Sequence, residues 1–369
     1  MAVSVHAIGV SADGQLPLPW LAPALARAQA LSQAHALLAW GPEGAGQLDF
    51  ALVRAQAWLC EQPQAAVQPG AGCGRCDSCH LVRSRSHPDL LLVLPEAQRL
   101  ALGWADGDDD KPKGEAKPSR DIRIAQLRQA IDWAQRTSGR GRGKVLLIHP
   151  ADAMNGPTAN ALLKTLEEPP GALRILLTSA DPERLLATVR SRCQRVPLAL
   201  PAAELACSWL QQQGMAQPQA LLAAAGGSPL EALALAQEGL TPALLAELPR
   251  RVAAGDAAVL SGRALPRVVE LLLKLAHDAM LQAVGGEPRF YPPSSLPAGA
   301  DLAALLAWQR LLQRTARHDE HPWNAPLLVE SLLSQARAAW PGGRGGRGGA
   351  GSGSGAGAGH RAASLHSPR

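Results

Sequence analysis

The stretch HALLAWGPEGAGQL, residues 35–48, places a short apolar run directly before a glycine-rich turn. The run 35–40 is typical of a buried β-strand, and residues 48–60 have helical periodicity. Similar apolar runs recur at 89–95, 144–148, 173–178 and 194–198, and helical segments at 122–137 and 158–168 stand among them. Strands that alternate with helices predict an α/β fold with a parallel sheet covered by helices on both faces.

The strand pattern ends after residue 201, and residues 202–340 have helical periodicity and many Ala, Leu and Gln residues. Breaks at 226–229 and at the Pro/Gly-rich stretch 286–299 divide this part of the chain. We expect an α/β domain over 1–200, a small helical domain over 201–243 and an all-α domain over 244–340. The segment 98–120 reads as a solvated polar insertion, and the Gly/Ser/Ala/Arg tail 341–369 is expected to be disordered.

Charge and hydropathy exclude several classes of protein. The chain has 369 residues and a formal net charge of +5, but four arginines lie in the acid-free tail, so the body carries only +1. This near-neutral body is not expected to bind DNA by bulk electrostatics. No apolar run approaches the roughly 18–20 residues of a membrane span, and no basic segment opens a signal peptide. We therefore expect a cytoplasmic protein.

Four of the six cysteines form the pattern C-x12-C-x2-C-x2-C, at Cys60, Cys73, Cys76 and Cys79. Overlapping C-x-x-C turns suit a structural Zn²⁺ ion held by four thiolates, one ion per chain, with no open position for catalysis. Two alternatives are a cluster of free thiols, and a site in which His80 or His87 replaces Cys60. Cys193 and Cys207 stand apart and are expected to be free thiols.

The turn after the first strand has the glycine spacing of a phosphate-binding loop, G-x-x-x-x-G-K-[ST]. Gly41, Gly44 and Gly46 supply the turn, but Gln47 stands at the lysine position and Leu48 at the hydroxyl position. The loop thus lacks both the cation that reaches the phosphates and the ligand for Mg²⁺. We expect a degenerate nucleotide loop.

A second element of phosphate chemistry is missing at the end of the strand 144–148. An acidic pair for Mg²⁺ and water would stand where the chain has His149 and Pro150. His149 is expected to be an ordinary packed histidine. Asp152 is either a displaced acid or the cap of a local turn. No catalytic site of the chain's own is expected.

Several longer motifs resemble a known family. The run NALLKTLEEPP, residues 160–170, and the run Arg190-Ser191-Arg192-Cys193 are similar to the clamp-loader branch of the AAA+ proteins. Together with the cysteine module, His87-Pro88-Asp89 and the stretch 183–193, they resemble the delta-prime subunits of bacterial DNA polymerase III. The resemblance is strong over 19–200, weaker to 340, and covers neither the insertion nor the tail.

The resemblance implies a RecA-like AAA+ domain carrying a zinc module at 60–87, then a helical lid over 201–243 and a collar over 244–340 that holds a pentamer together. It implies that Cys60 is the fourth zinc ligand. It further implies a subunit that binds no ATP and belongs to the DNA-directed DNA polymerase, a nucleotidyltransferase holoenzyme. Leu230 stands near the position of a nucleotide-contacting arginine in the related motor subunit.

The implied role is to help load the sliding clamp on primed DNA, in a hetero-pentamer with gamma/tau and delta subunits. Arg192, within the motif Ser191-Arg192-Cys193, would then act in trans as an arginine finger at a neighbouring motor's ATP site. Three alternatives stay open: a gamma/tau-like ATPase with a divergent loop, a zinc-containing regulatory protein that binds nucleic acid, and an Arg192 that makes only a local salt bridge.

Overall fold

The computed structural model describes residues 8–104, 117–317 and 324–340. The tail 341–369 and residues 105–116 of the expected insertion lie outside this range. The described residues divide into two compact units. Unit 1 is drawn from 1–248 and 287–295, and unit 2 from 249–286 and 296–340.

A five-stranded parallel sheet lies at the centre of unit 1, in the order β2-β3-β4-β1-β5. Its first strand pairs Ala36 with Ile175 on one side and Leu37 with Gln194 on the other. The strands are β1 Ala36–Trp40, β2 Leu90–Val93, β3 Lys144–Ile148, β4 Leu173–Ser179 and β5 Gln194–Pro197. The predicted parallel sheet is therefore confirmed, and each strand lies within two residues of the apolar run that predicted it.

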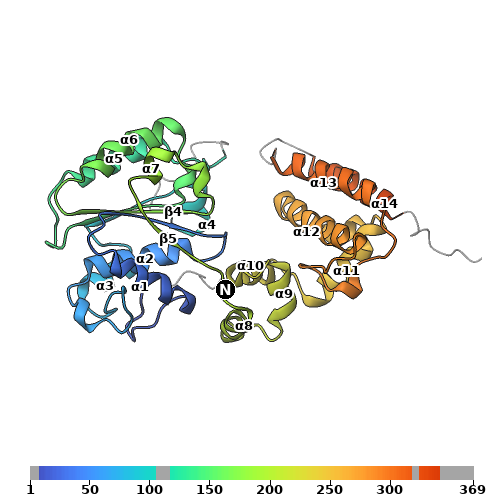
Figure 1. Cartoon of the computed structure of the whole chain (residues 1–369), viewed down its shortest axis with the longest axis horizontal. Helices are drawn as coiled ribbons and strands as arrows, with labels where there is room; N and C mark the ends of the chain where they lie inside the picture. The colour runs from blue at the N-terminus through green and yellow to red at the C-terminus, as the bar shows by residue number, and fades with distance from the viewer. Residues whose placement is uncertain (1–7, 105–116, 318–323, 341–369) are drawn as a thin grey trace, which may run out of the picture. The chain divides into compact units, whose positions relative to one another are not determined.

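Helices cover both faces of this sheet (Figure 1). One face carries α5 Ile124–Ala134, α6 Gly156–Glu167 and the short α7 Ala187–Arg190. The other carries α1 Ala22–Ala30, α2 Gln47–Leu59 and α3 Asp77–Arg83. Because both faces are covered, the strands need no polar alternation, and β1 and β3 are buried along almost their whole length.

The core between the sheet and α5–α6 explains why the apolar runs become strands here. Leu146 of β3 and Ile175 of β4 are register partners, and both are fully buried in one cluster with Leu38 of β1. Leu127 of α5 and Leu162 of α6 pack in the same cluster. Burying such side chains is the main favourable term in folding, at about 1.5–3 kcal/mol for each one.

The segment expected as a solvated insertion from residue 98 begins differently. Its first residues belong to α4 Glu96–Ala101, and Trp104 is buried. The guanidinium of Arg85 lies 5.3 Å from the centre of the Trp104 ring. This cation–π contact and the burial of the ring hold the start of the segment against the protein.

Three helices complete unit 1 after the sheet: α8 Ala203–Gln212, α9 Pro218–Ala224 and α10 Pro229–Gln237. Gly226 and Gly227 both have positive φ and end α9, and Ser228 caps α10 by accepting a hydrogen bond from the Glu231 backbone N–H at 3.2 Å. The helix α11 Pro242–Ala253 runs across the boundary between the two units.

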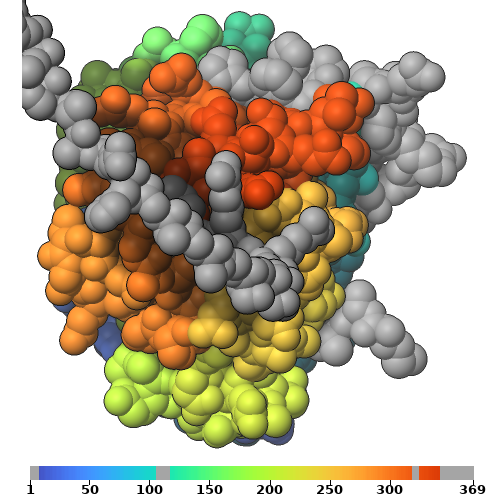
Figure 2. Space-filling model, turned by 90° about the vertical axis from the view of Figure 1, so that its right-hand side faces the viewer, coloured from blue at the N-terminus to red at the C-terminus, as the bar shows by residue number. Residues whose placement is uncertain are grey.

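Unit 2 is helical throughout its described residues, with α12 Leu265–Ala283, α13 Leu302–Arg317 and α14 Ala325–Ala339. These helices, coloured from gold to red, face the viewer in Figure 2. Trp308 and Trp340 pack edge to face at 6.1 Å. No helix in either unit, over the residues described, combines the length and the apolar character that crossing a bilayer requires.

Candidate functional site

The four cysteines of the spaced pattern lie together beside the sheet of unit 1. Cys60 follows the last residue of α2, Cys76 precedes α3 and Cys79 lies in the first turn of α3. The intervening turn brings Cys73 to the same place. All four side chains are buried, and their sulfur atoms lie within 4.8 Å of one another.

The spacing of these sulfurs fits a tetrahedral metal ion. The Sγ atoms of Cys60 and Cys76 are 3.9 Å apart, as are those of Cys73 and Cys79. Zinc–sulfur bonds of about 2.3 Å in a tetrahedron place the sulfurs about 3.8 Å apart. The four residues can therefore hold one metal ion. His80 is exposed and His87 lies outside the group, so neither replaces Cys60.

The backbone around the cluster prepares the sulfurs as ligands. Cys60 Sγ accepts the backbone N–H of Cys73 at 3.3 Å, and Cys73 Sγ accepts those of Arg75 and Cys76 at 3.4 Å each. Burial raises the pKa of the Cys60 thiol. Against the same effect of burial, the two N–H donors lower the pKa of Cys73 to about 7. Such N–H···S bonds stabilise the thiolate form that a metal needs.

Gly74, between Cys73 and Cys76, lies in a backbone turn that only glycine can adopt at this position. Its φ is +75°, and a Cβ atom there would lie 1.9 Å from the carbonyl oxygen of Ser11. Only glycine allows that close approach. The N-terminal segment is thereby packed on the cysteine module, where Val10 also bonds the Gln56 side chain at 2.6 Å.

A network of polar groups joins the module to the edge of the sheet. Arg140 pairs with Glu61, the residue after Cys60, and its Nε donates to Ser78 Oγ at 3.1 Å. Ser78 also bonds His87 Nε2 at 3.2 Å, and His87 Nδ1 accepts the backbone N–H of Asp89 at 3.1 Å.

The buried Asp89 carboxylate fixes the turn that precedes β3. It accepts the backbone N–H of Gly139 at 2.7 Å and of Arg140 at 2.8 Å, and the Ser138 hydroxyl at 2.9 Å. Burial alone would raise the pKa of Asp89, but these three donors together lower it. The sequence alone assigned no structural role to the motif His87-Pro88-Asp89. In the structure it connects the cysteine module to the turn that precedes β3.

The glycine turn of the degenerate loop lies between β1 and α2, as its sequence predicts. The side chain of Gln47 does not extend from it. Its Nε2 donates to the carbonyl oxygens of Gly41 and Pro42, each at 2.8 Å. The amide that replaces the lysine therefore closes the loop on itself, and Leu48 is buried.

Other side chains hold the loop from outside. Trp20 Nε1 donates to the carbonyl of Ala45 at 3.0 Å, and the Trp20 ring packs edge to face on Trp209 of α8 at 5.4 Å. A Cβ atom at Gly44 would lie 2.0 Å from Ser228 Oγ, which stands at the start of α10. The helices after the sheet thus contact the loop directly within unit 1.

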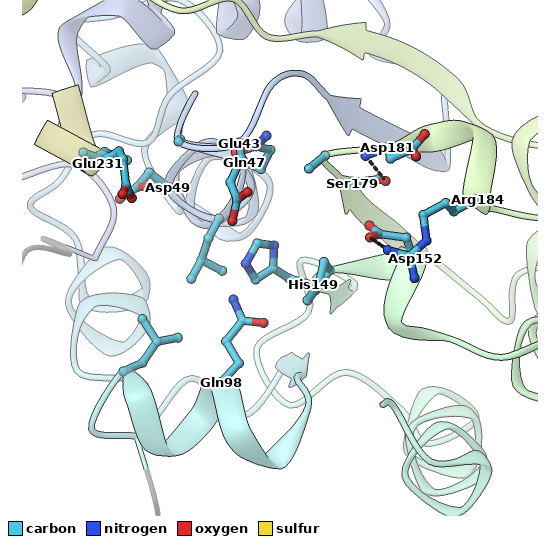
Figure 3. A pocket seen from close by; sticks show the side chains of 17 residues that line it. Glu43, Gln47, Asp49, Gln98, His149, Asp152, Ser179, Asp181, Arg184 and Glu231 are labelled. Atoms are coloured by element: carbon cyan, nitrogen blue, oxygen red, sulfur yellow. Dashed lines mark hydrogen bonds and ion pairs between the residues drawn. The ribbon is translucent and has the colours of Figure 1, made fainter. Parts of the chain in front are cut away.

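A cavity of about 520 Å³ opens beside this loop (Figure 3). It is lined by five carboxylates and one arginine: Glu43, Asp49, Asp152, Asp181, Glu231 and Arg184. Asp49 is buried in the first turn of α2, where the helix dipole already favours a negative charge. The cavity has the size of a ligand pocket but a charge opposite to the one that phosphates require.

The strand-end residues face the same cavity. His149 Nδ1 bonds Thr178 Oγ1 at 2.6 Å. Asp152 lies in a short 3₁₀ turn, Ala151–Ala153, and its carboxylate is 3.9 Å from Arg184 Nη1. It does not cap that turn, so the capping alternative is wrong for Asp152. Its pairing with Arg184 places it at the cavity wall.

Arg192 lies after α7 and is partly exposed. Its Nε donates to Glu167 Oε1 at 2.8 Å, and its Nη1 donates to the Thr188 carbonyl at 2.8 Å. In this single chain the local salt bridge considered from the sequence is therefore present. Exposed pairs of this kind contribute only about 0–1 kcal/mol, so Arg192 can leave Glu167 at small cost.

The remaining cysteines do not join the metal cluster. Cys193 is buried beside Arg192, and burial raises its pKa to about 12, while Cys207 on α8 is half-buried. Both are free thiols, as expected. The contacts of Trp20 and Ser228 with the loop, and the acidic wall of the cavity, carry no local sequence signal.

Comparisons with known proteins match this chain to subunits of DNA polymerase III. The model of a family described as "DNA polymerase III, delta subunit" matches residues 24–201. The DNA polymerase III subunit delta-prime of Pseudomonas aeruginosa is 38% identical over 211 residues, which cover 56% of this chain and 57% of that protein. The delta-prime subunit of Escherichia coli is 33% identical over 276 residues, which cover 71% of this chain and 75% of the relative.

A tau subunit matches less of the chain. The DNA polymerase III subunit tau of E. coli is 31% identical over 159 residues, 43% of this chain and 20% of that protein. The match thus spans just over half of the P. aeruginosa relative, three quarters of the E. coli delta-prime subunit and a fifth of tau.

Proposed function

The chain belongs to the family of DNA polymerase III delta-prime subunits, and on that premise we propose that it acts as a clamp-loader subunit that neither binds nor hydrolyses ATP. It joins gamma/tau and delta subunits in a hetero-pentamer that loads the sliding clamp on primed DNA in the cytoplasm. It has no catalytic site of its own and is a component of the polymerase holoenzyme.

The observation that carries the absence of ATP chemistry is the way Gln47 closes the loop. Phosphoryl transfer depends on positioning and on positive charge at the phosphates. Here an amide bound to Gly41 and Pro42 replaces the lysine, and five carboxylates line the cavity that a nucleotide would enter. Leu48 offers no oxygen to Mg²⁺. These independent losses argue against the gamma/tau-like alternative.

Titration of the purified chain with Mg·ATP tests this part of the proposal. We expect no saturable heat at micromolar to millimolar nucleotide. The variant Gln47→Lys is the sharper test. It restores the lysine, but it restores no Mg²⁺ ligand and leaves the five carboxylates that line the cavity. We expect it to bind no better than wild type. Tight binding by wild type would support the ATPase alternative, whereas tight binding by Gln47→Lys alone would show that Gln47 by itself excludes the nucleotide.

We further propose that the cysteine cluster holds one structural Zn²⁺ ion. When bound, the ion supplies a fixed tetrahedral link between the end of α2 and the start of α3, which are otherwise joined by a loop. The donor set is four sulfurs with no open position, so the site is structural. The near-neutral body gives no support to the alternative of an independent nucleic-acid-binding regulator.

Arg192 is proposed to act on a neighbouring subunit's ATP. A planar guanidinium matches phosphate oxygens and stabilises the charge that develops on the transferred group. Its position at the end of α7, partly exposed and held by one surface carboxylate, supports such a role. Ser191 and Cys193 place it there: the Ser191 hydroxyl donates to the Thr188 carbonyl at 3.1 Å, and Cys193 is buried.

The domain division follows from the same proposal. Residues 1–200 are the AAA+ domain, 201–243 the lid, and 244–340 the collar that assembles the pentamer. The contact of Ser228 with Gly44 and the packing of Trp209 on Trp20 support a lid held by protein contacts in place of a nucleotide. Co-elution of the chain with gamma/tau and delta, and its loss on deletion of 296–340, which spares the residues of unit 1, tests the assignment of the collar.

A further inference from the structure

Two arginines in unit 1 share one tryptophan ring and form no ion pair with any carboxylate in the described residues. Arg54 of α2 and Arg174 of β4 lie over the ring of the same tryptophan, Trp58, at 4.9 and 5.1 Å from its centre. The site lies on the face of the sheet covered by α1 and α2 (Figure 1), and α2 carries both Arg54 and Trp58.

Each guanidinium is bound only to neutral groups among the described residues. Arg54 Nη1 donates to the Gly70 carbonyl at 3.2 Å, and Arg174 Nη1 donates to the Ser32 carbonyl at 3.1 Å. Neither makes an ion pair with a described carboxylate. By contrast, Arg140, Arg184, Arg190 and Arg192 of the same unit each pair with an acid.

The arrangement is costly as it stands. Arg54 is 5% exposed, its Nε has no hydrogen-bond partner, and neither has the buried Nε1 of Trp58. Burial and the nearby charge of Arg174 lower the pKa of Arg54 to about 10. Burying a charge without a counter-charge is unfavourable, and two like charges on one ring add repulsion.

We propose that Arg54, Trp58 and Arg174 form an anion site that takes a phosphate group. Arg174 and Trp58 are half-buried and can be reached from solvent, whereas Arg54 is buried against the same ring and contributes its charge over a longer distance. Guanidinium groups bind phosphate oxygens through paired N–H donors. Two uncompensated positive charges match a phosphate of about −1.5 to −2 at neutral pH, whereas a carboxylate would neutralise only one of them.

This site is separate from the degenerate loop. The loop follows the carboxyl end of β1, whereas Arg174 stands near the start of the parallel strand β4, at the other end of the sheet. The proposal therefore stands or falls independently of the clamp-loader assignment. The phosphate has two possible sources, a free phosphate ion or the backbone of a nucleic acid, and the test distinguishes them.

The test titrates the full-length, metal-loaded chain with inorganic phosphate by calorimetry, at constant ionic strength with chloride as the balancing anion. We expect saturable binding by wild type. Arg174→Gln should raise the dissociation constant at least about tenfold, because it removes a charge-assisted contact. The matched control is Arg195→Gln, an exposed arginine on β5, which should bind phosphate as wild type does.

Two further measurements close the test. Arg174→Lys keeps the charge but loses the paired donors, so its binding should fall between wild type and Arg174→Gln. If a short DNA oligonucleotide competes with phosphate in wild type but not in Arg174→Gln, the site takes backbone phosphates. If it does not compete, the site takes the free ion. No saturable phosphate binding by wild type, or equal binding by wild type and a folded Arg174→Gln, would overturn the proposal.

Discussion

Replacement of Asp89 by asparagine tests the hydrogen bonds that connect the cysteine module to the turn before β3. The carboxylate receives three hydrogen bonds and gives none: from the Gly139 backbone, the Arg140 backbone and the Ser138 hydroxyl. An asparagine has nearly the same shape, but one of its two positions becomes an NH₂ group. Because one oxygen accepts the Gly139 N–H and the other accepts the Arg140 N–H, the NH₂ group faces a backbone donor whichever way the amide turns.

The expected cost follows from this count. A hydrogen bond to a charged group contributes about 1.5–3 kcal/mol, and the variant loses at least one such bond together with the charge that strengthens the others. The bonds to the Gly139 and Arg140 backbone are only part-buried, so solvent can replace some of the loss. We therefore expect Asp89→Asn to lower the free energy of unfolding at pH 7 by about 2–3 kcal/mol.

The pKa of Asp89 determines how the stabilisation by its carboxylate changes with pH. The pKa of Asp89 is lower in the folded chain than in the unfolded one, where it is near 3.9. A lowered pKa means that the ionised carboxylate stabilises the fold above about pH 4, and that this contribution is lost as the pH falls through the folded value. The gap between wild type and Asp89→Asn should shrink below pH 4, where Asp89 itself takes up a proton. At higher pH the gap also contains the titration of His87, because burial lowers the pKa of His87 and the charge of Asp89 opposes that effect.

Urea unfolding at several pH values measures this gap. Asp121→Asn, at an exposed aspartate whose side chain makes no ion pair in the described residues, is the matched control and should cost less than about 0.5 kcal/mol at every pH. An Asp89→Asn chain as stable as the control at pH 7 would refute the reasoning. So would a stability gap that does not shrink below pH 4.

The remaining predictions concern the metal and the loop. Protein purified without chelator should contain about one zinc per chain by elemental analysis, and Cys76→Ser should lose it while Cys207→Ser keeps it; zinc-free wild type that is well folded would contradict this. Chelation should lower the melting temperature of wild type more than that of Cys76→Ser, as read by calorimetry. Trp20→Ala, which removes the bond to Ala45 and the packing on Trp209, should cost about 3–5 kcal/mol in urea unfolding; a loss below 1 kcal/mol would show that Trp20 does not hold the loop.

The fold of unit 1 was predictable because its signals are local. The strand Lys144–Ile148 is a continuous apolar run and appears with the predicted bounds. The helix α6 ends at Glu167, just before two prolines that cannot continue it. Parallel strands buried on both faces give such runs, so pattern and structure agree.

The four cysteines were predictable as metal ligands, but the hydrogen bonds that connect their module to the sheet were not. The spacing of Cys73, Cys76 and Cys79 brings three sulfurs together by local turns. The link from Asp89 to residues 138–140 joins positions about fifty residues apart, and no local pattern marks it.

The charge of the cavity was equally hidden in the sequence. Glu43 is visible in the loop, but Asp152, Asp181 and Glu231 reach the same wall from separate elements. The start of the polar insertion was misread for a related reason. Trp104 looks like one residue in a hydrophilic stretch, and only tertiary packing beneath Arg85 buries it.

One measurement tests the central claim most directly: the ATPase rate of the reconstituted clamp-loader complex carrying Arg192→Ala, with clamp and primed DNA present. Arginine fingers contribute roughly 10³–10⁵ in rate at a single site. The other motor sites keep their own fingers, so the account predicts a partial loss of stimulated ATPase and of clamp loading. Zinc content and assembly should be unchanged. Glu167→Gln, which frees Arg192 without removing it, should retain the wild-type rate. An Arg192→Ala complex that loads clamps as fast as wild type would contradict the account.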